Sequence, residues 1–216
     1  MDLDTKISEY LPLSYTERIR QFYSDFKGAR ILVTTSLGNT SPILLKLISE
    51  VRPDQEISFI DTGYHFNDTL LFKDRLQKHL GIKINRVRPE TIHHQPTKEN
   101  MLWNIDPDFC CLVNKVFPMR GLVKSHDVWI SGLMAHQNEN RRNKKIFEQK
   151  DVLKFYPVLD MTEKESKGFI KTYDLPMHPL SSEGYGSVGC FHCTQRACGR
   201  EGRWSKFEKT ECGLHV

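Results

Sequence analysis

The chain has 216 residues, a formal net charge of +4 and six cysteines. This length is enough for one large domain with a substantial buried core. Because the basic residues are mixed with acidic ones, the composition excludes a general nucleic-acid-binding protein. The longest apolar runs, such as the one that begins at Ala29, fall far short of the roughly 20 residues that a membrane span requires.

The N-terminus, MDLDTKISEY, carries acidic residues and lacks the basic and then apolar pattern of a secretory signal. The sequence therefore predicts a cytoplasmic protein. In that reducing compartment, six cysteines are expected to be metal ligands or catalysts rather than disulfides.

Helix and strand patterns alternate in the first part of the chain. Apolar residues at helical spacing predict an amphipathic helix over residues 14–26, and the short β-branched run at 29–35 predicts a buried strand. A polar loop follows at 36–41. The next helix is expected to begin near Pro42, because proline suits the first helical turn.

The same order is then repeated. Residues 56–61 predict a second strand, residues 67–81 contain a helix that Gly81 can end, and residues 82–89 predict a third strand. Strands that alternate with helices indicate an α/β fold with a parallel, twisted sheet and flanking helices. In such a sheet, ligands bind at the carboxyl ends of the strands.

Two loops occupy that position. The first contains Ser36, Gly38 and Ser41 before a helix N-terminus, where hydroxyls, backbone N–H groups and the helix dipole suit an anion. Turn requirements alone also make such loops rich in serine and glycine. Asp61 ends the second strand and is either an acceptor for a ribose hydroxyl or an ordinary turn residue.

The second half of the chain has weaker patterns. Residues 127–133 and 153–160 predict later strands, and Thr162 with Glu165 forms a capping box that opens a helix. From about Leu180 the sequence is rich in Gly, Ser and Cys, with little periodicity. We find no internal repeat and no linker that would divide the chain into two domains.

A basic run, NENRRNKK, covers residues 138–145. Such a run is commonly a solvated loop or helix face. The alternative is a collar for an anionic small molecule.

The cysteines are the most informative residues. Cys110 and Cys111 are adjacent, and Cys190 and Cys193 form a CxxC pair. A structural zinc site would more usually use two CxxC pairs and fits adjacent cysteines poorly, so an iron–sulfur cluster held by four thiolates is a serious competitor. Taken alone, Cys110 and Cys111 could equally be small buried hydrophobic residues.

Six strings occur in a fixed order: TTSLGNTS, IDTGYHF, the cysteine pair followed by Lys115, the CxxC pair, REGRW and the terminal KTECGLH. Together they resemble the assimilatory adenylyl-sulfate (APS) reductases of the CysH family, relatives of the 3′-phosphoadenylyl-sulfate (PAPS) reductases. The resemblance extends from about residue 30 to the end. The fold of that family, an adenine-nucleotide α-hydrolase-like α/β sheet, agrees with the pattern above.

The resemblance implies a role for the tail cysteine. Cys212 would attack the sulfate sulfur of APS and displace AMP, and thioredoxin or glutaredoxin would then release sulfite from the S-sulfocysteine. One thiol must meet a buried nucleotide first and a protein dithiol second, and thiol exchange requires access. We therefore expect a single domain at residues 1–204 and a mobile tail at 205–216, with His215 solvated.

The resemblance also assigns the cations and the cofactor. Arg200 and Arg203 would hold the phosphosulfate, and Lys115 would lie between the cofactor and the substrate, since a thiolate is otherwise repelled by an anionic sulfate. The 4Fe-4S cluster would be held by four cysteines: Cys110, Cys111, Cys190 and Cys193. This cysteine set usually accompanies APS rather than PAPS, and the cluster is expected to have a structural and electrostatic role.

Two features depart from the family pattern. Met134 stands where an arginine is expected, which moves the anion contact to Arg141 or Arg142. Cys198 is an additional cysteine, expected to be a spare buried thiol, although a fifth cysteine also complicates the choice of ligands. A PAPS site would want a further cation, for which the candidates are Arg86, Arg88 and Lys98.

Other functions remain open from the sequence. They are a PAPS reductase, a non-catalytic iron–sulfur or zinc redox sensor that needs no reactive tail thiol, and an enzyme that transfers sulfur to RNA on the same fold. The modest charge and the complete KTECGLH string disfavour the last. The sequence leaves open whether the chain forms a homo-oligomer.

Overall fold

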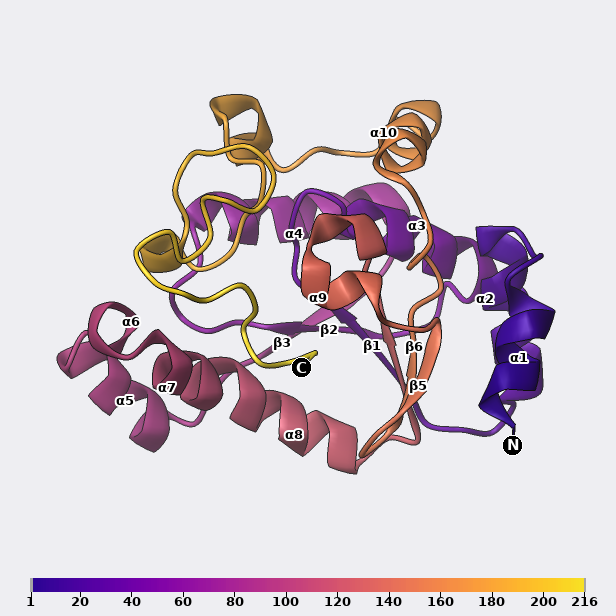
Figure 1. Cartoon of the computed structure of the whole chain (residues 1–216), viewed down its shortest axis with the longest axis horizontal. Helices are drawn as coiled ribbons and strands as arrows, with labels where there is room; N and C mark the ends of the chain where they lie inside the picture. Colours follow the sequence, from indigo (N-terminus) through magenta and orange to yellow (C-terminus); the bar gives the residue numbers. More distant parts are fainter. Residues whose placement is uncertain (1, 216) are drawn as a thin grey trace.

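The computed structural model describes residues 2–215. Six strands form one sheet in the order β3-β2-β1-β4-β6-β5 (Figure 1). Their bounds are Ile31–Thr35 (β1), Ile57–Ile60 (β2), Ile84–Val87 (β3), Val128–Ser131 (β4), Phe147–Gln149 (β5) and Leu153–Phe155 (β6). All neighbouring strands are parallel except β5 and β6, which form an antiparallel pair.

Helices cover both faces of this sheet. They are α1 (Leu3–Tyr10), α2 (Tyr15–Asp25), α3 (Ser41–Val51), α4 (Asn67–Leu80), α5 (Thr91–Glu99), α6 (Leu102–Ile105), α7 (Pro107–Cys111), α8 (Phe117–Lys124), α9 (Glu139–Arg142) and α10 (Glu163–Thr172). A π-helix, Leu112–Val116, joins α7 to α8. In Figure 1, α3, α4 and α10 lie on one side of the sheet and α5 to α8 lie on the other.

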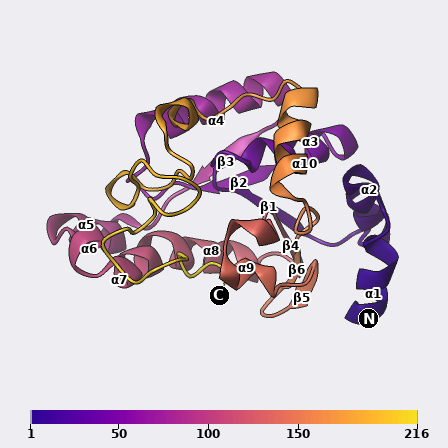
Figure 2. The same cartoon turned by 45° about the horizontal axis from the view of Figure 1, so that its top comes forward.

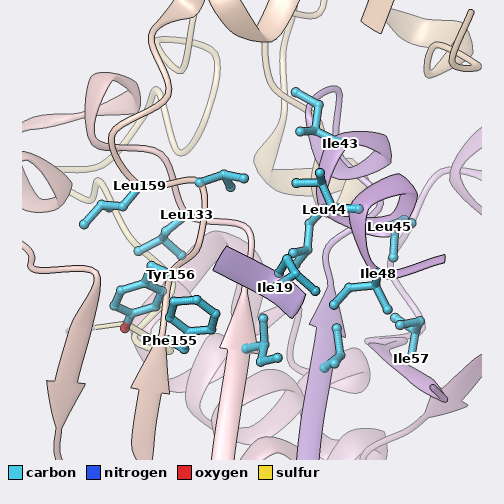
Figure 3. Close-up of a cluster of buried hydrophobic side chains, with 14 of the residues drawn as sticks. Ile19, Ile43, Leu44, Leu45, Ile48, Ile57, Leu133, Phe155, Tyr156 and Leu159 are labelled. Atoms are coloured by element: carbon cyan, nitrogen blue, oxygen red, sulfur yellow. The ribbon is translucent and has the colours of Figure 1, made fainter. Parts of the chain in front are cut away.

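Alternate residues of the central strands enter two separate cores. Val33 and Ile130 pack with α2, α3 and α4 in the larger core (Figure 3), whereas Leu32 and Trp129 pack with Met119 of α8 in the smaller one. This two-sided burial explains why β1 and β4 are apolar without alternation. Burying each large aliphatic side chain contributes about 1.5–3 kcal/mol.

The predicted α/β fold, with its mostly parallel sheet and flanking helices, is confirmed. Local signals also appear where the sequence placed them: Thr162 and Glu165 form a capping box, and Gly81 ends α4 with a left-handed φ of 65°. The sequence patterns missed α1, the antiparallel strand β5 and the helices α5, α6, α7, α8 and α9. Within residues 2–215, no helix combines the length and apolar character needed to cross a membrane.

The last part of the chain returns to the middle of the molecule. In Figures 1 and 2 its final segment runs between α8 and α9. Residues 205–215 contain no helix or strand. The C-terminal segment is therefore placed by side-chain contacts beside the carboxyl ends of the strands.

Candidate functional site

A cavity of about 560 Å³ opens at the carboxyl ends of β1 and β4. The strand order runs outward in opposite directions from these two strands, and such a reversal is where open α/β sheets bind ligands. The walls combine apolar side chains, among them Leu45, Met119 and Trp129, with polar groups from several loops. This size and composition suit a nucleotide.

The loop at 36–41 lies on the cavity, as the sequence predicts. Ser36, Gly38 and Ser41 all line it, and the Ser36 and Ser41 hydroxyl oxygens are 3.4 Å apart. Leu37 between them has a φ of 54°, a conformation that is costly for a residue with a side chain. The α3 N-cap, Thr40, makes no side-chain capping bond to the described residues; the Ser41 and Ile43 N–H groups donate to the Gly38 and Thr40 carbonyls, and Pro42 has no N–H.

Asp61 has a different place from the one predicted. It is buried, it is not among the described residues that line the cavity, and its Oδ2 accepts hydrogen bonds from Arg86 and Arg88. Burial would raise the pKa of Asp61, but the hydrogen bonds from Arg86, from the Gly63 N–H and from Arg88 lower it below its ordinary value. The other interpretation, a turn residue, fits instead: Asp61 Oδ1 accepts from the Gly63 N–H at 3.1 Å, and Oδ2 pairs with Arg86 and Arg88. The remaining candidate for a PAPS cation, Lys98, is exposed on α5.

Three predicted cations converge on the cavity: Lys115, Arg200 and Arg203 line it together with Cys212. Burial would lower the pKa of Lys115, but its electrostatic interactions with Cys190, Cys111 and Cys212 raise it above its ordinary value. Burial and the neighbouring Arg141 lower the pKa of Arg200 to about 10. The cavity is therefore a strongly cationic site that would stabilise an anionic ligand.

Arg203 is held by a close backbone approach. Its Nη1 donates to the Val188 carbonyl at 3.3 Å, and its guanidinium lies 4.4 Å from the Trp204 ring centroid. A side chain on Gly189 would collide with that guanidinium. Because Gly189 directly precedes Cys190, this contact joins the substrate cavity to the cysteine segment.

The four predicted ligand cysteines also come together. Cys110, Cys111, Cys190 and Cys193 line a small second cavity, and Lys115 lines both cavities. Burial and the neighbouring cysteines raise the pKa of Cys110 to about 12 and that of Cys193 to about 11. Lys115 thus lies between the cysteines and the candidate substrate site, as the resemblance implies.

Hydrogen bonds support two of these sulfurs. The Thr62 hydroxyl lies 3.3 Å from the Cys190 Sγ, and Asn114 Nδ2 donates to the Cys110 Sγ at 3.6 Å. Asn114 Oδ1 also accepts from His94 Nδ1 at 2.7 Å, and Asn114 Nδ2 donates to the Thr97 hydroxyl at 3.0 Å. The sequence analysis missed Asn114, although it stands four residues after Cys110, a spacing that brings helical neighbours together.

The donor set fits an iron–sulfur cluster. Four cysteine sulfurs facing one enclosed cavity are the ligand set that such clusters use. Among residues 2–215, no group of three or more His, Cys, Asp or Glu side chains is arranged to hold a single metal ion.

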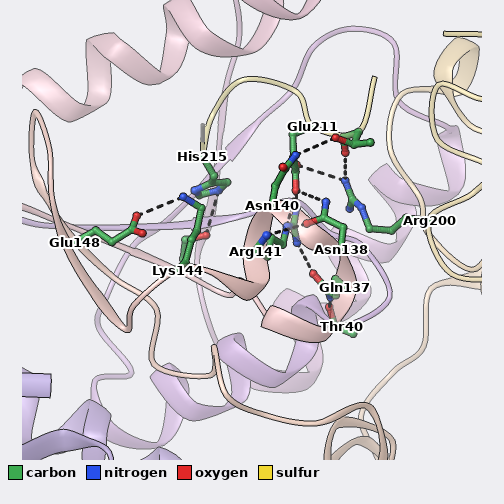
Figure 4. Close-up of polar contacts among 12 residues, drawn as sticks. Thr40, Gln137, Asn138, Asn140, Arg141, Lys144, Glu148, Arg200, Glu211 and His215 are labelled. Carbon is green, nitrogen blue, oxygen red and sulfur yellow. Dashed lines mark hydrogen bonds and ion pairs between the residues drawn. The ribbon is translucent and has the colours of Figure 1, made fainter. Parts of the chain in front are cut away.

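The C-terminal segment closes part of the large cavity. Cys212 is partly buried on its wall, and Figure 4 labels two other residues of the same segment, Glu211 and His215. The prediction of a solvated His215 is wrong: its ring stacks on Trp129 at 4.7 Å, and its Nδ1 is buried. The expectation that Cys198 is buried is also wrong, because this thiol is exposed.

The basic run at 138–145 divides into two environments. Arg141 is buried on the cavity wall and pairs with Glu211, whereas Arg142 is exposed and pairs with Glu139. The interpretation as a solvated face therefore holds for Arg142 but not for Arg141.

Comparisons with known proteins agree with this geometry. A family model described as "Phosphoadenosine phosphosulfate reductase domain" matches residues 30–196. The adenosine 5′-phosphosulfate reductase of Staphylococcus haemolyticus is 36% identical over 199 residues, covering 88% of this chain and 82% of that protein. A phosphoadenylyl-sulfate (PAPS) reductase structure from Candida auris, in a phosphate complex, has a TM-score of 0.75 at 20% identity and covers 89% of this chain and 95% of its own. An FMN adenylyltransferase from Candida glabrata, in complex with FMN and an ATP analogue, has a TM-score of 0.58 at 16% identity. The match covers 88% of this chain and 71% of the adenylyltransferase chain. At these identities the two structures establish a shared fold.

Proposed function

The chain belongs to the phosphoadenosine phosphosulfate reductase family, and we propose that it reduces APS to sulfite and AMP through an S-sulfocysteine on Cys212. This reaction would serve assimilatory sulfate reduction and cysteine biosynthesis in the cytoplasm. One observation carries the proposal: Cys212, Lys115, Arg200 and Arg203 line the same nucleotide-sized cavity. The adenosine 5′-phosphosulfate reductase relative supports APS as the substrate.

The cavity offers a place for each part of the substrate. The apolar wall suits the adenine, and the hydroxyls and N–H groups of the loop at 36–41 suit an oxyanion. Arg200 and Arg203 would bind the phosphosulfate, because a guanidinium matches oxyanion geometry. Lys115 adds a compact positive charge on the side of the cysteines.

In the first step, the Cys212 thiolate attacks the sulfur of the sulfate group. A sulfur–sulfur bond forms, and the bond from that sulfur to the phosphate oxygen breaks. AMP leaves with the electron pair of the broken bond. The cations lower the repulsion between the thiolate and the anionic sulfate, which otherwise opposes the approach.

In the second step, a thiolate of reduced thioredoxin or glutaredoxin attacks the Cys212 sulfur and displaces sulfite. The second thiol of the reductant then resolves the mixed disulfide, so the dithiol supplies both electrons and becomes oxidised. The reductant needs access to Cys212, which is partly buried on the cavity wall. We therefore propose residues 205–216 as a tail that docks for the first step and leaves for the second.

Cys110, Cys111, Cys190 and Cys193 would hold a 4Fe-4S cluster. When bound, the cluster would offset the negative charge of four buried thiolates and tie two distant segments together. Lys115, which lines both cavities, would keep its ammonium directed at the substrate. The dithiol supplies both electrons, so the cluster is not required as a donor.

An equal mixture of APS and PAPS tests the proposal. The anaerobically purified protein and reduced thioredoxin are given both nucleotides, and the released nucleotide is identified by chromatography. AMP alone is the expected result. Adenosine 3′,5′-bisphosphate in comparable amount would assign PAPS as a substrate and contradict APS specificity.

The redox sensor is the alternative to a catalytic protein. It is supported by the four facing cysteines alone, and it has no use for Cys212. Release of neither nucleotide from the mixture would favour the sensor, provided that the protein retains iron.

A further inference from the structure

Glu211, the residue before the proposed nucleophile, is held by α9. Its Oε1 accepts hydrogen bonds from Arg141 Nε at 2.5 Å and from Asn138 Nδ2 at 2.8 Å, and its Oε2 accepts from Arg141 Nη2 at 3.1 Å (Figure 4). The side chains are only 11% exposed for Arg141 and 8% exposed for Glu211. A two-point guanidinium–carboxylate pair of this kind fixes orientation as well as distance.

The surrounding residues orient the Arg141 guanidinium before the tail arrives. Arg141 Nη1 donates to the Gln137 side-chain oxygen, and Gln137 Nε2 donates in turn to the Thr40 hydroxyl at 3.1 Å. Thr40 belongs to the loop at 36–41. Arg141 is thereby linked to the predicted anion-binding loop, and a preorganised side chain loses less entropy when it binds.

Residues before and after Cys212 also contact the body of the protein. Asn140 Nδ2 donates to the Thr210 hydroxyl at 3.0 Å, which holds the chain before Glu211. After Cys212, Leu214 packs into the smaller core, and His215 stacks on Trp129 with an interplanar angle of 22°. Cys212 is consequently held between two anchors on the wall of the cavity.

We propose that Arg141 is a positioning residue that binds Glu211 and so directs Cys212 at the substrate. This assignment rests on the proposed function and differs from the expectation that Arg141 meets the substrate anion. Arg200 also contacts the tail, because its Nη2 donates to the Thr210 carbonyl at 3.2 Å and to Glu211 at 3.4 Å. The buried Nε atoms of Arg200 and Arg203 have no partner among the described residues and remain available for that anion.

The first test measures exposure of Cys212 without turnover. The cluster-loaded protein, in a Cys198→Ser background that removes the exposed thiol, receives a pulse of iodoacetamide, and the tail peptide is quantified by mass spectrometry. We expect Arg141→Gln and Glu211→Gln to raise the alkylation rate of Cys212 roughly tenfold, because a buried charged hydrogen-bond pair is lost. Arg142→Gln and Glu208→Gln make the same charge changes one and three residues away and should leave the rate unchanged. Equal rates in all four variants would overturn the proposal.

The second test separates positioning from substrate binding. With APS in excess, single-turnover formation of the S-sulfocysteine should fall roughly tenfold in Glu211→Gln, because a misplaced nucleophile reacts slowly. The Kd of APS, measured with Cys212 replaced by Ser, should be unchanged by the same substitution. Faster S-sulfocysteine formation would mean that Glu211 obstructs the substrate and would overturn the proposal. So would a loss of APS affinity in Arg141→Gln that accounts for its whole loss of rate.

The AMP-release experiment tests the proposed function, and the alkylation experiment tests docking of the tail, so each can fail without the other. If the wild-type protein does not release AMP but the alkylation rates respond as expected, the proposed reductase function is rejected and docking of the tail by Arg141 is supported. If AMP is released and the alkylation rates do not respond, the reverse holds.

Discussion

The site formed by Cys110, Cys111, Cys190 and Cys193 and the C-terminal segment that carries Cys212 hold their sulfurs in different ways. Four cysteines lie on two segments that pack together through aromatic contacts, including Trp103 stacked on His192 at 4.0 Å. Cys212 lies in a segment without helix or strand, anchored chiefly by the Glu211 pair and the His215 stack. Under the proposed function, one site has groups that stay in place, and the other has a group that would leave and return.

This difference separates stability from turnover. Removing a ligand sulfur should damage the fold, because metal binding contributes to folding free energy. Removing the tail sulfur should leave the fold intact, since few packed residues depend on it. The following changes test that separation.

The largest effect is expected for Cys212→Ser. Turnover of APS should fall by a factor of roughly 10⁴ or more, because the nucleophile is lost. Iron content and the thermal unfolding midpoint should match the wild-type protein. Cys198→Ser serves as the control and should keep full turnover. Substantial activity in Cys212→Ser would place the reactive thiol elsewhere.

Cys190→Ser should lower iron content and stability, the two properties that Cys212→Ser should leave unchanged. Cys190 is buried and lies against the Thr62 hydroxyl at 3.3 Å. Loss of one of four ligands should abolish stable iron binding and lower the unfolding midpoint by roughly 10 °C. Iron analysis and anaerobic calorimetry measure both quantities. Normal iron content in this variant would exclude Cys190 as a ligand.

Acid should weaken the packing of His178, the residue before the 3₁₀ helix Pro179–Glu183, against α4. Its Nε2 lies 3.0 Å from the Thr69 hydroxyl of α4, and burial lowers its pKa to about 4. An unfolded chain takes up this proton near pH 6.5, whereas the folded chain does not. Stability from His178 is therefore complete above pH 6.5 and is lost as the pH falls toward 4, by about 2–3 kcal/mol.

Urea unfolding at pH values from 7 to 4.5 measures that loss. His178→Gln should reduce the slope of the unfolding free energy against pH. His126, which is on the opposite side of the sheet and partly exposed, provides the control as His126→Gln. An unchanged slope in His178→Gln would assign the acid sensitivity to other groups.

Asn114→Ala should give the smallest effect. The substitution removes the donor to the Cys110 Sγ. It also removes the acceptor for His94 in the same buried network. We expect a destabilisation of about 2 kcal/mol and faster loss of iron to a chelator. Asn104→Ala, at an exposed position on α6, should change neither. Equal chelation rates would show that the network does not protect the ligand.

The sequence predicts the parts of this molecule that depend on local pattern. The strand at 31–35, the loop at 36–41 and the helix after it follow from apolar runs and turn residues close together in the chain. The convergence of Cys110, Cys111, Cys190 and Cys193 was expected from their spacing and from the family resemblance.

Contacts between distant segments could not be predicted in the same way. Arg141 and Glu211 are separated by 70 residues, and neither neighbouring sequence indicates the other. Asp61 ends a strand as expected, but the register of β2 and β3 sets Arg86 opposite Phe59 and so supplies its partner. The region from α5 to α8 carries exposed Ile92, Ile105 and Phe109, which obscure the apolar stripe of an ordinary helix.

The π-helix at Leu112–Val116 has a consequence for how the chain length can vary. A π-helical turn is equivalent to one residue inserted into an α-helix. Deletion of Leu112 would let α7 and α8 join as a single α-helix with Met119 still facing the smaller core, but would place Lys115 three residues after Cys111 instead of four. We expect such a deletion to keep most of the unfolding midpoint and to abolish APS turnover. The extra residue would then be one that the chain retains for its chemistry and that its folding does not require.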